Sequence, residues 1–299
     1  MSQAHDAAPC FATQFQLRSE LHATQQRILE DFAKSIYVQL SPDLLSSVEL
    51  ACERGASNWL SCLPLKFHGF ALHKTAFRDA VMLRYHWTPP ACPTSCPCGH
   101  DFTIDHCISC PKGGFPSLRH NEVRDLTATM MSEVCSNVST EPHLQPLTGE
   151  ALRFRTANSD SNARLDIAAN GFWGGRFERS FFDVRVFNPG APSNRPFKSA
   201  YRRHEKEKRR QYEQRVREVE HGHFTPLVFT TTGGMGDAAS QVYKRLANLL
   251  CDKLDLSYGE IMGWIRCKLS FALVRSAIMC IRGARSRLHS PISEAPVDV

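Results

Sequence analysis

Hydrophobic and polar positions alternate most clearly in residues 163–187, where two short runs with the period of a β-strand flank a glycine-rich turn at 170–175. The apolar positions are Leu165, Ile167 and Ala169 in the first run and Phe182, Val184 and Val186 in the second. Each run carries one aspartate, Asp166 or Asp183, on its less apolar face. The turn supplies glycines for positive φ, so the pattern predicts a hairpin that brings the two carboxylates together.

Other segments show helical periodicity or the composition of buried strands. Helices are predicted over 14–37, from Pro42 to Gly55, within 57–87, over 117–138, over 199–223, around 242–249 and over 259–282, and further strands over 137–142 and 224–232. The proline-rich step at 89–97 indicates a boundary, and the tail 286–299 has the composition of a disordered segment.

Composition and charge fit a soluble globular protein. The 299 residues are 42% hydrophobic and 22% charged, with a formal net charge of +6. The N-terminus has no basic stretch followed by an apolar core, and no run approaches the roughly 18 apolar residues of a spanning helix. We therefore expect an intracellular protein, nuclear or cytoplasmic, without membrane association.

Five of the twelve cysteines lie between positions 92 and 110. Cys96, Cys98, His106 and Cys110 form the pattern C-x-C-x₇-H-x₃-C. Three thiolates and one imidazole suit tetrahedral Zn²⁺, and four protein ligands make a structural site. The possible substitute ligands are Cys92, His100 and Cys107. The alternative is a group of reduced, partly buried cysteines.

Two close carboxylates repel each other unless a positive charge lies between them. A divalent cation such as Mg²⁺ or Mn²⁺ would bridge Asp166 and Asp183, as in sites for phosphoryl transfer. The alternative is two solvated strand aspartates. A third acid is expected from Glu122, which the helical pattern places near Leu126 and Met130, or from Glu141 at the end of the strand 137–142.

Basic residues concentrate in the predicted helix 199–223. Its apolar stripe runs through Tyr212 and Val216, and one turn before Tyr212 the stripe reaches Lys208. Lys206 lies on nearly the opposite side, so Lys208 is expected to face the fold and Lys206 the solvent. The candidate nucleic-acid contacts are Arg119, Arg185, Arg202, Arg203, Lys206, Arg209 and Arg210.

The order of acids, strands and basic helix resembles the α/β core of PD-(D/E)xK nucleases, the restriction-endonuclease-like fold. A Cys/His knuckle, then RHNEVRD, the RLD and DVRV strands and K-x-x-x-Y resemble the restriction-like endonuclease region at the C-terminus of non-LTR retrotransposon polyproteins. The resemblance covers about residues 92–285, and the segment before it resembles the linker that follows a reverse transcriptase. The chain contains no Ala-Asp-Asp tripeptide behind an aromatic residue, so we expect no reverse-transcriptase active site in it.

The resemblance implies roles for individual residues. Asp166 and Asp183 would be the metal ligands and catalytic acids, with Glu122 or Glu141 as the first acid. The family's third motif places a lysine two residues after the second acid, but here Arg185 occupies that position. Arginine cannot act as a base in a protein. The retrotransposon branch resembles a version with the lysine on the next helix, where Lys208 matches.

These expectations define four regions and two functions. The regions are a helical N-terminal segment 1–90, a zinc knuckle 91–115, a nuclease domain 116–285 and the tail 286–299. The expected function is a metal-dependent endonuclease that nicks DNA, with DNA and possibly element RNA as partners. The alternative is a catalytically inactive, zinc-containing nucleic-acid-binding remnant of a reverse-transcriptase polyprotein.

Overall fold

The computed structural model describes residues 11–284, so the predicted tail lies outside the described residues. The chain divides into two compact units, 1–47 and 48–299, and this division does not coincide with the expected boundaries at 90 and 115. Helix α1 (Phe11–Tyr37) forms most of the described part of the first unit. Its apolar stripe is exposed, with Ile28 63% and Phe32 65% accessible. Helix α2 (Pro42–Ala51) begins at the predicted proline and crosses into the second unit.

A four-stranded mixed sheet organises the described part of the second unit. The strands are β1 (Ser136–Thr140), β2 (Ile167–Asn170), β3 (Arg179–Phe187) and β4 (His223–Thr230), in the order β1-β2-β3-β4. The first three strands pair antiparallel, and β3 pairs parallel with β4. The α/β class predicted from the sequence is therefore confirmed.

The parallel pair requires a crossover connection, because the chain must return to the end of the sheet at which β3 begins before β4 can start. Helix α7 (Phe197–Glu218) supplies it, after the short 3₁₀ helix η2 (Pro192–Asn194). It packs on β4 and β3. Val216 and the partly buried Tyr212 of the predicted stripe contact Phe181 and Phe224 of the sheet in one buried cluster.

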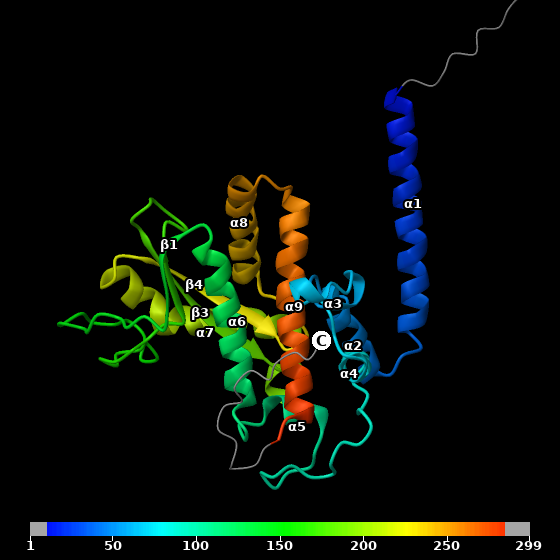
Figure 1. Ribbon diagram of the computed structural model, residues 1–299, viewed down its shortest axis with the longest axis horizontal. Helices are drawn as coiled ribbons and strands as arrows, with labels where there is room; N and C mark the ends of the chain where they lie inside the picture. The colour runs from blue at the N-terminus through cyan, green and yellow to red at the C-terminus, as the bar shows by residue number, and fades with distance from the viewer. Residues whose placement is uncertain (1–10, 285–299) are drawn as a thin grey trace, which may run out of the picture. The chain divides into compact units, whose positions relative to one another are not determined.

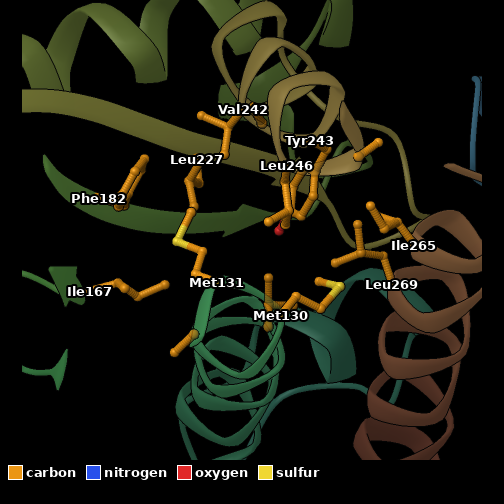
Figure 2. Close-up of a cluster of buried hydrophobic side chains, with 14 of the residues drawn as sticks. Met130, Met131, Ile167, Phe182, Leu227, Val242, Tyr243, Leu246, Ile265 and Leu269 are labelled. Carbon is orange, nitrogen blue, oxygen red and sulfur yellow. The ribbon is translucent and has the colours of Figure 1, made fainter. Parts of the chain in front are cut away.

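The main core lies on the other face of the sheet. Three helices cover this face, α6 (Phe115–Ser132), α8 (Asp237–Leu254) and α9 (Tyr258–Arg282), and α9 packs against both α6 and α8 (Figure 1). Figure 2 shows Met131 of α6 among side chains of the sheet, beside Ile167 and Leu227. The hydroxyl groups of Thr127 and Tyr243 lie 2.6 Å apart and join α6 to α8 inside this core.

Short helices connect the N-terminal part of the second unit to α9. They are α3 (Asn58–Ser61), the 3₁₀ helix η1 (Lys66–His68), α4 (Lys74–Arg84) and α5 (Ile104–Ser109). Trp59, Phe70 and Ala80 pack against Phe271 of α9. Between residues 11 and 284, no helix combines the length and apolarity needed to cross a bilayer.

Two local predictions require correction. The inward face of α6 passes through Val123, Thr127 and Met130, whereas Glu122 is exposed. Leu126 lies one turn after Glu122 and Val123 directly beside it, which made the stripe ambiguous by one residue, or 100° of rotation. The hairpin turn is also longer than predicted, because β2 ends at Asn170 and β3 begins only at Arg179.

Candidate active site and metal cluster

Strand register brings the two aspartates together. Ile167 pairs with Phe182 in the antiparallel β2–β3 ladder. Extending this register by one residue places Asp166, which immediately precedes β2, opposite Asp183. Directly opposed residues of antiparallel strands share a face and have Cβ atoms about 4.5–5.5 Å apart. Both carboxylates therefore lie on the face that α7 covers.

Helix α7 directs a lysine at this pair. The Nζ atom of Lys208 lies 2.6 Å from Oδ2 of Asp183, and both side chains are largely buried, with 16% and 7% of their surfaces exposed. Lys206, two residues earlier, is exposed. The helical phase thus places Lys208 towards the sheet and Lys206 towards solvent, in the orientations that the apolar stripe predicted.

Asp166, the other aspartate of the pair, is held by two groups of its own. Oδ1 of Asp166 lies 2.9 Å from Nε2 of His120 on α6, and Oδ2 accepts a 2.6 Å hydrogen bond from the backbone N–H of Val184. Sequence reasoning missed His120. The available signal was the position of His120 one turn before Val123, on the inward face of α6. This signal can be used only when the inward face of the helix has been assigned correctly.

Burial and charge move the pKa values of the two acids in opposite directions. Burial raises the pKa of Asp183 to about 6, with the Asp166 charge adding to the increase and Lys208 opposing it. Burial acts on Asp166 as well, but the hydrogen bond and charge of His120, with the Val184 N–H, outweigh it and lower the pKa of Asp166. Such a divergence within a pair of carboxylates is typical of functional sites.

The donor set fits a divalent cation. Oδ2 of Asp183 is buried, and the ammonium group of Lys208 lies 2.6 Å from it, so this oxygen has one charged partner and keeps further lone-pair capacity. Each oxygen of Asp166 receives one partner and keeps further lone-pair capacity. Hard carboxylate oxygens are the ligands that Mg²⁺ and Mn²⁺ prefer.

The candidate first acids lie in different places. Glu122 is exposed on α6, and its charge acts on Arg275 of α9. Glu141 follows β1, and its backbone N–H donates a 2.9 Å hydrogen bond to the carbonyl of Asp166. Its carboxylate forms ion pairs with Arg124 and Arg164. Of these two acids, Glu141 is the one whose backbone contacts Asp166, while its carboxylate is paired with the two arginines.

Several of the predicted nucleic-acid contacts have structural partners. Arg119 is only 3% exposed and donates to the carbonyl of Ile108, so the prediction that it contacts nucleic acid is wrong. Arg203 donates to the carbonyl of Ser193, and Arg209 pairs with Glu213 at 2.6 Å. Arg185 is half-buried on β3. The exposed basic positions of α7 that have no ion pair in the described part of the chain are Arg202, Arg203, Lys206 and Arg210, and of these Arg203 is held by its hydrogen bond to Ser193.

The four predicted soft ligands form one cluster. One ligand atom each from Cys96, Cys98, His106 and Cys110 lies within 4.8 Å of the others. The Sγ atoms of Cys96 and Cys110 are 3.9 Å apart, and Sγ of Cys98 lies 3.1 Å from Nε2 of His106. Tetrahedral zinc–sulfur bonds of about 2.3 Å require sulfur atoms roughly 3.8 Å apart. The cluster can hold a metal ion, and its geometry fits Zn²⁺.

Local polar contacts favour ligation by this group. The backbone N–H of His100 lowers the pKa of Cys98 to about 6, whereas burial raises the pKa of Cys96. A bound cation would hold the Cys96 sulfur as thiolate. Nδ1 of His100 is 3.5 Å from Sγ of Cys98, so this histidine lines the cluster. The other two substitutes, Cys92 and Cys107, lie outside the group.

The cysteine cluster is joined to the aspartate site through the fold. Asn188, directly after β3, donates to the carbonyl and carboxylate of Asp105 on α5 at 3.2 Å. Arg119 of α6 donates to Ile108 of the same short helix at 3.1 Å. Helix α5 therefore connects the metal-ligand segment both to the strand that carries Asp183 and to the helix that carries His120.

Comparison of the chain with protein-family models and with curated proteins finds no match to either.

Proposed function

We propose that this chain is a metal-dependent DNA endonuclease of the restriction-endonuclease-like, PD-(D/E)xK, class, which nicks target DNA by phosphodiester hydrolysis. The observation that carries the proposal is the convergence of Asp166, Asp183 and Lys208 from two strands and the crossover helix. Two acids from neighbouring strands and a lysine beside one of them match the resemblance to the nuclease region of non-LTR retrotransposon polyproteins. Such an activity implies DNA as the partner and the nucleus as the place of action.

The residues of the site have separate tasks in this proposal. Asp166 and Asp183 would hold Mg²⁺ or Mn²⁺, and the ion would supply charge stabilisation at the scissile phosphate and lower the pKa of a bound water. His120 fixes the orientation of the Asp166 carboxylate through its 2.9 Å contact. Lys208 lies beside Asp183, where its ammonium group orients the attacking water and stabilises negative charge on the phosphorane.

Arg185 cannot replace the lysine as a base because its guanidinium remains protonated. The arginine therefore marks the strand position of the third motif, and Lys208 provides the amine from α7. We assign Zn²⁺ a purely structural role at Cys96, Cys98, His106 and Cys110, since four protein ligands leave no open coordination position.

A plasmid-nicking assay tests the proposal. Purified protein is incubated with supercoiled DNA in Mg²⁺ or Mn²⁺, and the expected result is a nicked circle for the wild type. Asp183→Asn and Lys208→Ala should reduce the rate by at least about a hundredfold. Lys198→Ala is the matched control, since this lysine is exposed on the same helix and has no part in the proposed site, and it should retain wild-type activity. Circular dichroism verifies that each variant is folded.

Equal nicking by wild type and Asp183→Asn would contradict the assignment. The cysteine cluster and the exposed basic residues of α7 favour one other function, an inactive nucleic-acid-binding remnant. DNA binding by the wild-type protein with no metal-dependent nicking would favour this second function. A steep decrease of affinity with salt would show that phosphate contacts dominate it.

A further inference from the structure

The polar loop between β1 and β2 is fastened to α7. Arg215 of α7 is 1% exposed and donates hydrogen bonds to three loop carbonyls, those of Gln145, Asn158 and Asp160, at 2.7, 2.9 and 2.8 Å. Arg153 donates its backbone N–H to Gln214 at 2.7 Å. A surface loop fixed by a buried arginine presents its side chains in a defined place, unlike a loop that merely connects two strands.

This fastened loop presents an aromatic ring between arginines. The guanidinium carbons of Arg153 and Arg210 lie 5.5 and 5.7 Å from the ring centre of Phe154, at the distances of cation–π contacts. Phe154 is nevertheless 38% exposed, and Arg155 next to it is exposed as well. The ring is therefore held between two guanidinium groups while more than a third of its surface stays open to solvent.

The basic residues of α7 extend from this ring along one side of the helix. Arg202, Lys206 and Arg210 are spaced four residues apart, so they follow one another along the helix with a rise of about 6 Å per step. No ion pair involves these residues, Arg153 or Arg155 within residues 11–284, whereas Arg209 and Arg217 are paired with glutamates. The unneutralised charges therefore form a line that ends at Phe154.

We propose that Phe154, with Arg153, Arg155 and Arg210, is a stacking platform for an unpaired base, and that Arg202 and Lys206 hold the phosphates of the same single strand. Interleaved aromatic and basic side chains are the means by which proteins hold single strands, because every base has a π-face and every linkage a negative charge. A paired base keeps its faces inside the duplex, so the ring selects nucleic acid that is unpaired. The inference deepens the proposed function, because the line lies on the helix that carries Lys208.

Binding measured in the absence of cleavage tests the platform separately from the nuclease. Fluorescence anisotropy of full-length Asp183→Asn protein, without added Mg²⁺, is recorded with a labelled single-stranded DNA and with a blunt duplex of the same sequence. Adding Phe154→Ala should weaken single-strand binding by about five- to a hundredfold, from about 1–3 kcal/mol for each stacked base. Duplex binding should change less than twofold. Phe154→Trp should retain single-strand affinity, because it keeps an aromatic face.

Matched controls separate stacking from surface effects and charge. Phe67→Ala removes a phenylalanine that is 95% exposed in η1 and should leave both affinities unchanged. Lys206→Ala should reduce the salt dependence of single-strand binding by about 0.7 in the logarithmic slope.

The platform is refuted if Phe154→Ala leaves single-strand affinity within twofold of its parent, or weakens both probes equally. It is also refuted if the parent binds neither probe at low salt. Failure of nicking in the plasmid assay, with single-strand binding that depends on Phe154, would overturn the proposed nuclease and support the platform. Nicking by the wild type with no effect of Phe154→Ala on binding would support the proposed nuclease and overturn the platform.

Discussion

Lys206 and Lys208 lie two positions apart on α7 but have different environments. The ammonium group of Lys208 lies beside a buried carboxylate at 2.6 Å, whereas Lys206 is exposed. Removing one partner of a buried ion pair is costly because the other charge remains buried without compensation. Substitution by alanine at position 208 removes the buried ion pair, whereas substitution at position 206 only changes the composition of the helix. Comparing the stability of the two variants therefore isolates the contribution of the ion pair.

We predict that Lys208→Ala lowers the free energy of unfolding by roughly 3 kcal/mol without divalent metal, because the buried carboxylate of Asp183 loses its ion-pair partner. Added Mg²⁺ should restore part of this loss, since the ion would replace the missing positive charge. Lys206→Ala should change stability by less than about 0.5 kcal/mol. Urea denaturation at several Mg²⁺ concentrations measures both variants, and a loss at position 208 that is insensitive to Mg²⁺ would argue against metal binding there.

His120 provides a second residue-scale prediction. Substitution by alanine removes the 2.9 Å contact to Asp166 but leaves the aspartate itself in place. We expect nicking to fall by about 10–100-fold, with the Mg²⁺ concentration for half-maximal rate increased, because groups that orient a metal ligand have effects of this size. His120→Gln should recover part of the activity. An unchanged dependence on Mg²⁺ would show that His120 does not orient the metal ligand.

Sequence patterns predicted some of these residues and missed others for physical reasons. Strand alternation and helical phase were sufficient for Asp166, Asp183 and Lys208, because each lies in an element with a clear apolar face. Helix α6 has no clear apolar face, since its buried residues include Arg119, Arg124 and Thr127, so the same reasoning selected Glu122 and overlooked His120. Arg119 was misassigned because a basic residue in a sequence gives no sign that it is buried.

Helix α4 is attached to α9 by a buried acid. Asp79 is 1% exposed, and Nε of Arg282 contacts its carboxylate at 2.6 Å while Arg78 contacts it at 3.1 Å. The hydrogen bond from Arg282, which outweighs burial, lowers the pKa of Asp79 below its ordinary 3.8. This pairing holds together two elements separated by about 200 residues of chain.

The lowered pKa makes a pH-dependent prediction. Because Asp79 binds its proton more weakly in the folded state, its stabilising contribution is fully present above the unfolded-state pKa of about 4 and is lost as the pH falls through the lower folded-state value. Asp79→Asn should therefore lower the free energy of unfolding by about 2 kcal/mol at pH 7. The difference from wild type should shrink at about pH 2.5. Denaturant titrations at both pH values measure it, and a constant difference would exclude the ion pair as its cause.

Element-scale prediction succeeded where periodicity extended over several turns. The helices that became α1, α7 and α9 and the strand that became β4 were predicted within a few residues. The short helix α5 was not predicted, because six residues within a cysteine-rich segment show too little periodicity. The parallel pairing of β3 and β4 depends on contacts distant in sequence, which local patterns do not contain.

At the scale of the whole molecule, the cysteine cluster has a structural influence beyond its own residues. Through α5 it contacts the end of β3 by way of Asn188 and contacts α6 by way of Arg119. Ile104 and Ile108 of α5 also pack with Phe115 and Cys280 of α6 and α9. Loss of a bound ion would therefore loosen the elements that position both Asp183 and His120.

We predict that purified protein contains zinc, and that Cys110→Ser removes it and lowers the unfolding temperature by on the order of 10 °C. Cys92→Ser is the matched control, since Cys92 lies outside the cluster, and should retain both zinc and stability. Elemental analysis and thermal unfolding measure the two effects. Wild-type protein without zinc, or with an unchanged fold after chelation, would contradict the prediction.

The hydrogen bond from Val184 to the carboxylate of Asp166 turns one backbone amide into a spectroscopic reporter. Val184 follows Asp183 in the chain. Its N–H therefore donates to the carboxylate of Asp166, while its nitrogen is bonded to the backbone carbonyl carbon of Asp183. In a ¹⁵N–¹H spectrum this single resonance would register whatever neutralises either carboxylate. Titration with Mg²⁺ should shift this resonance in the wild type. A larger shift in Lys208→Ala would show that Mg²⁺ takes over the charge neutralisation that the lysine provides.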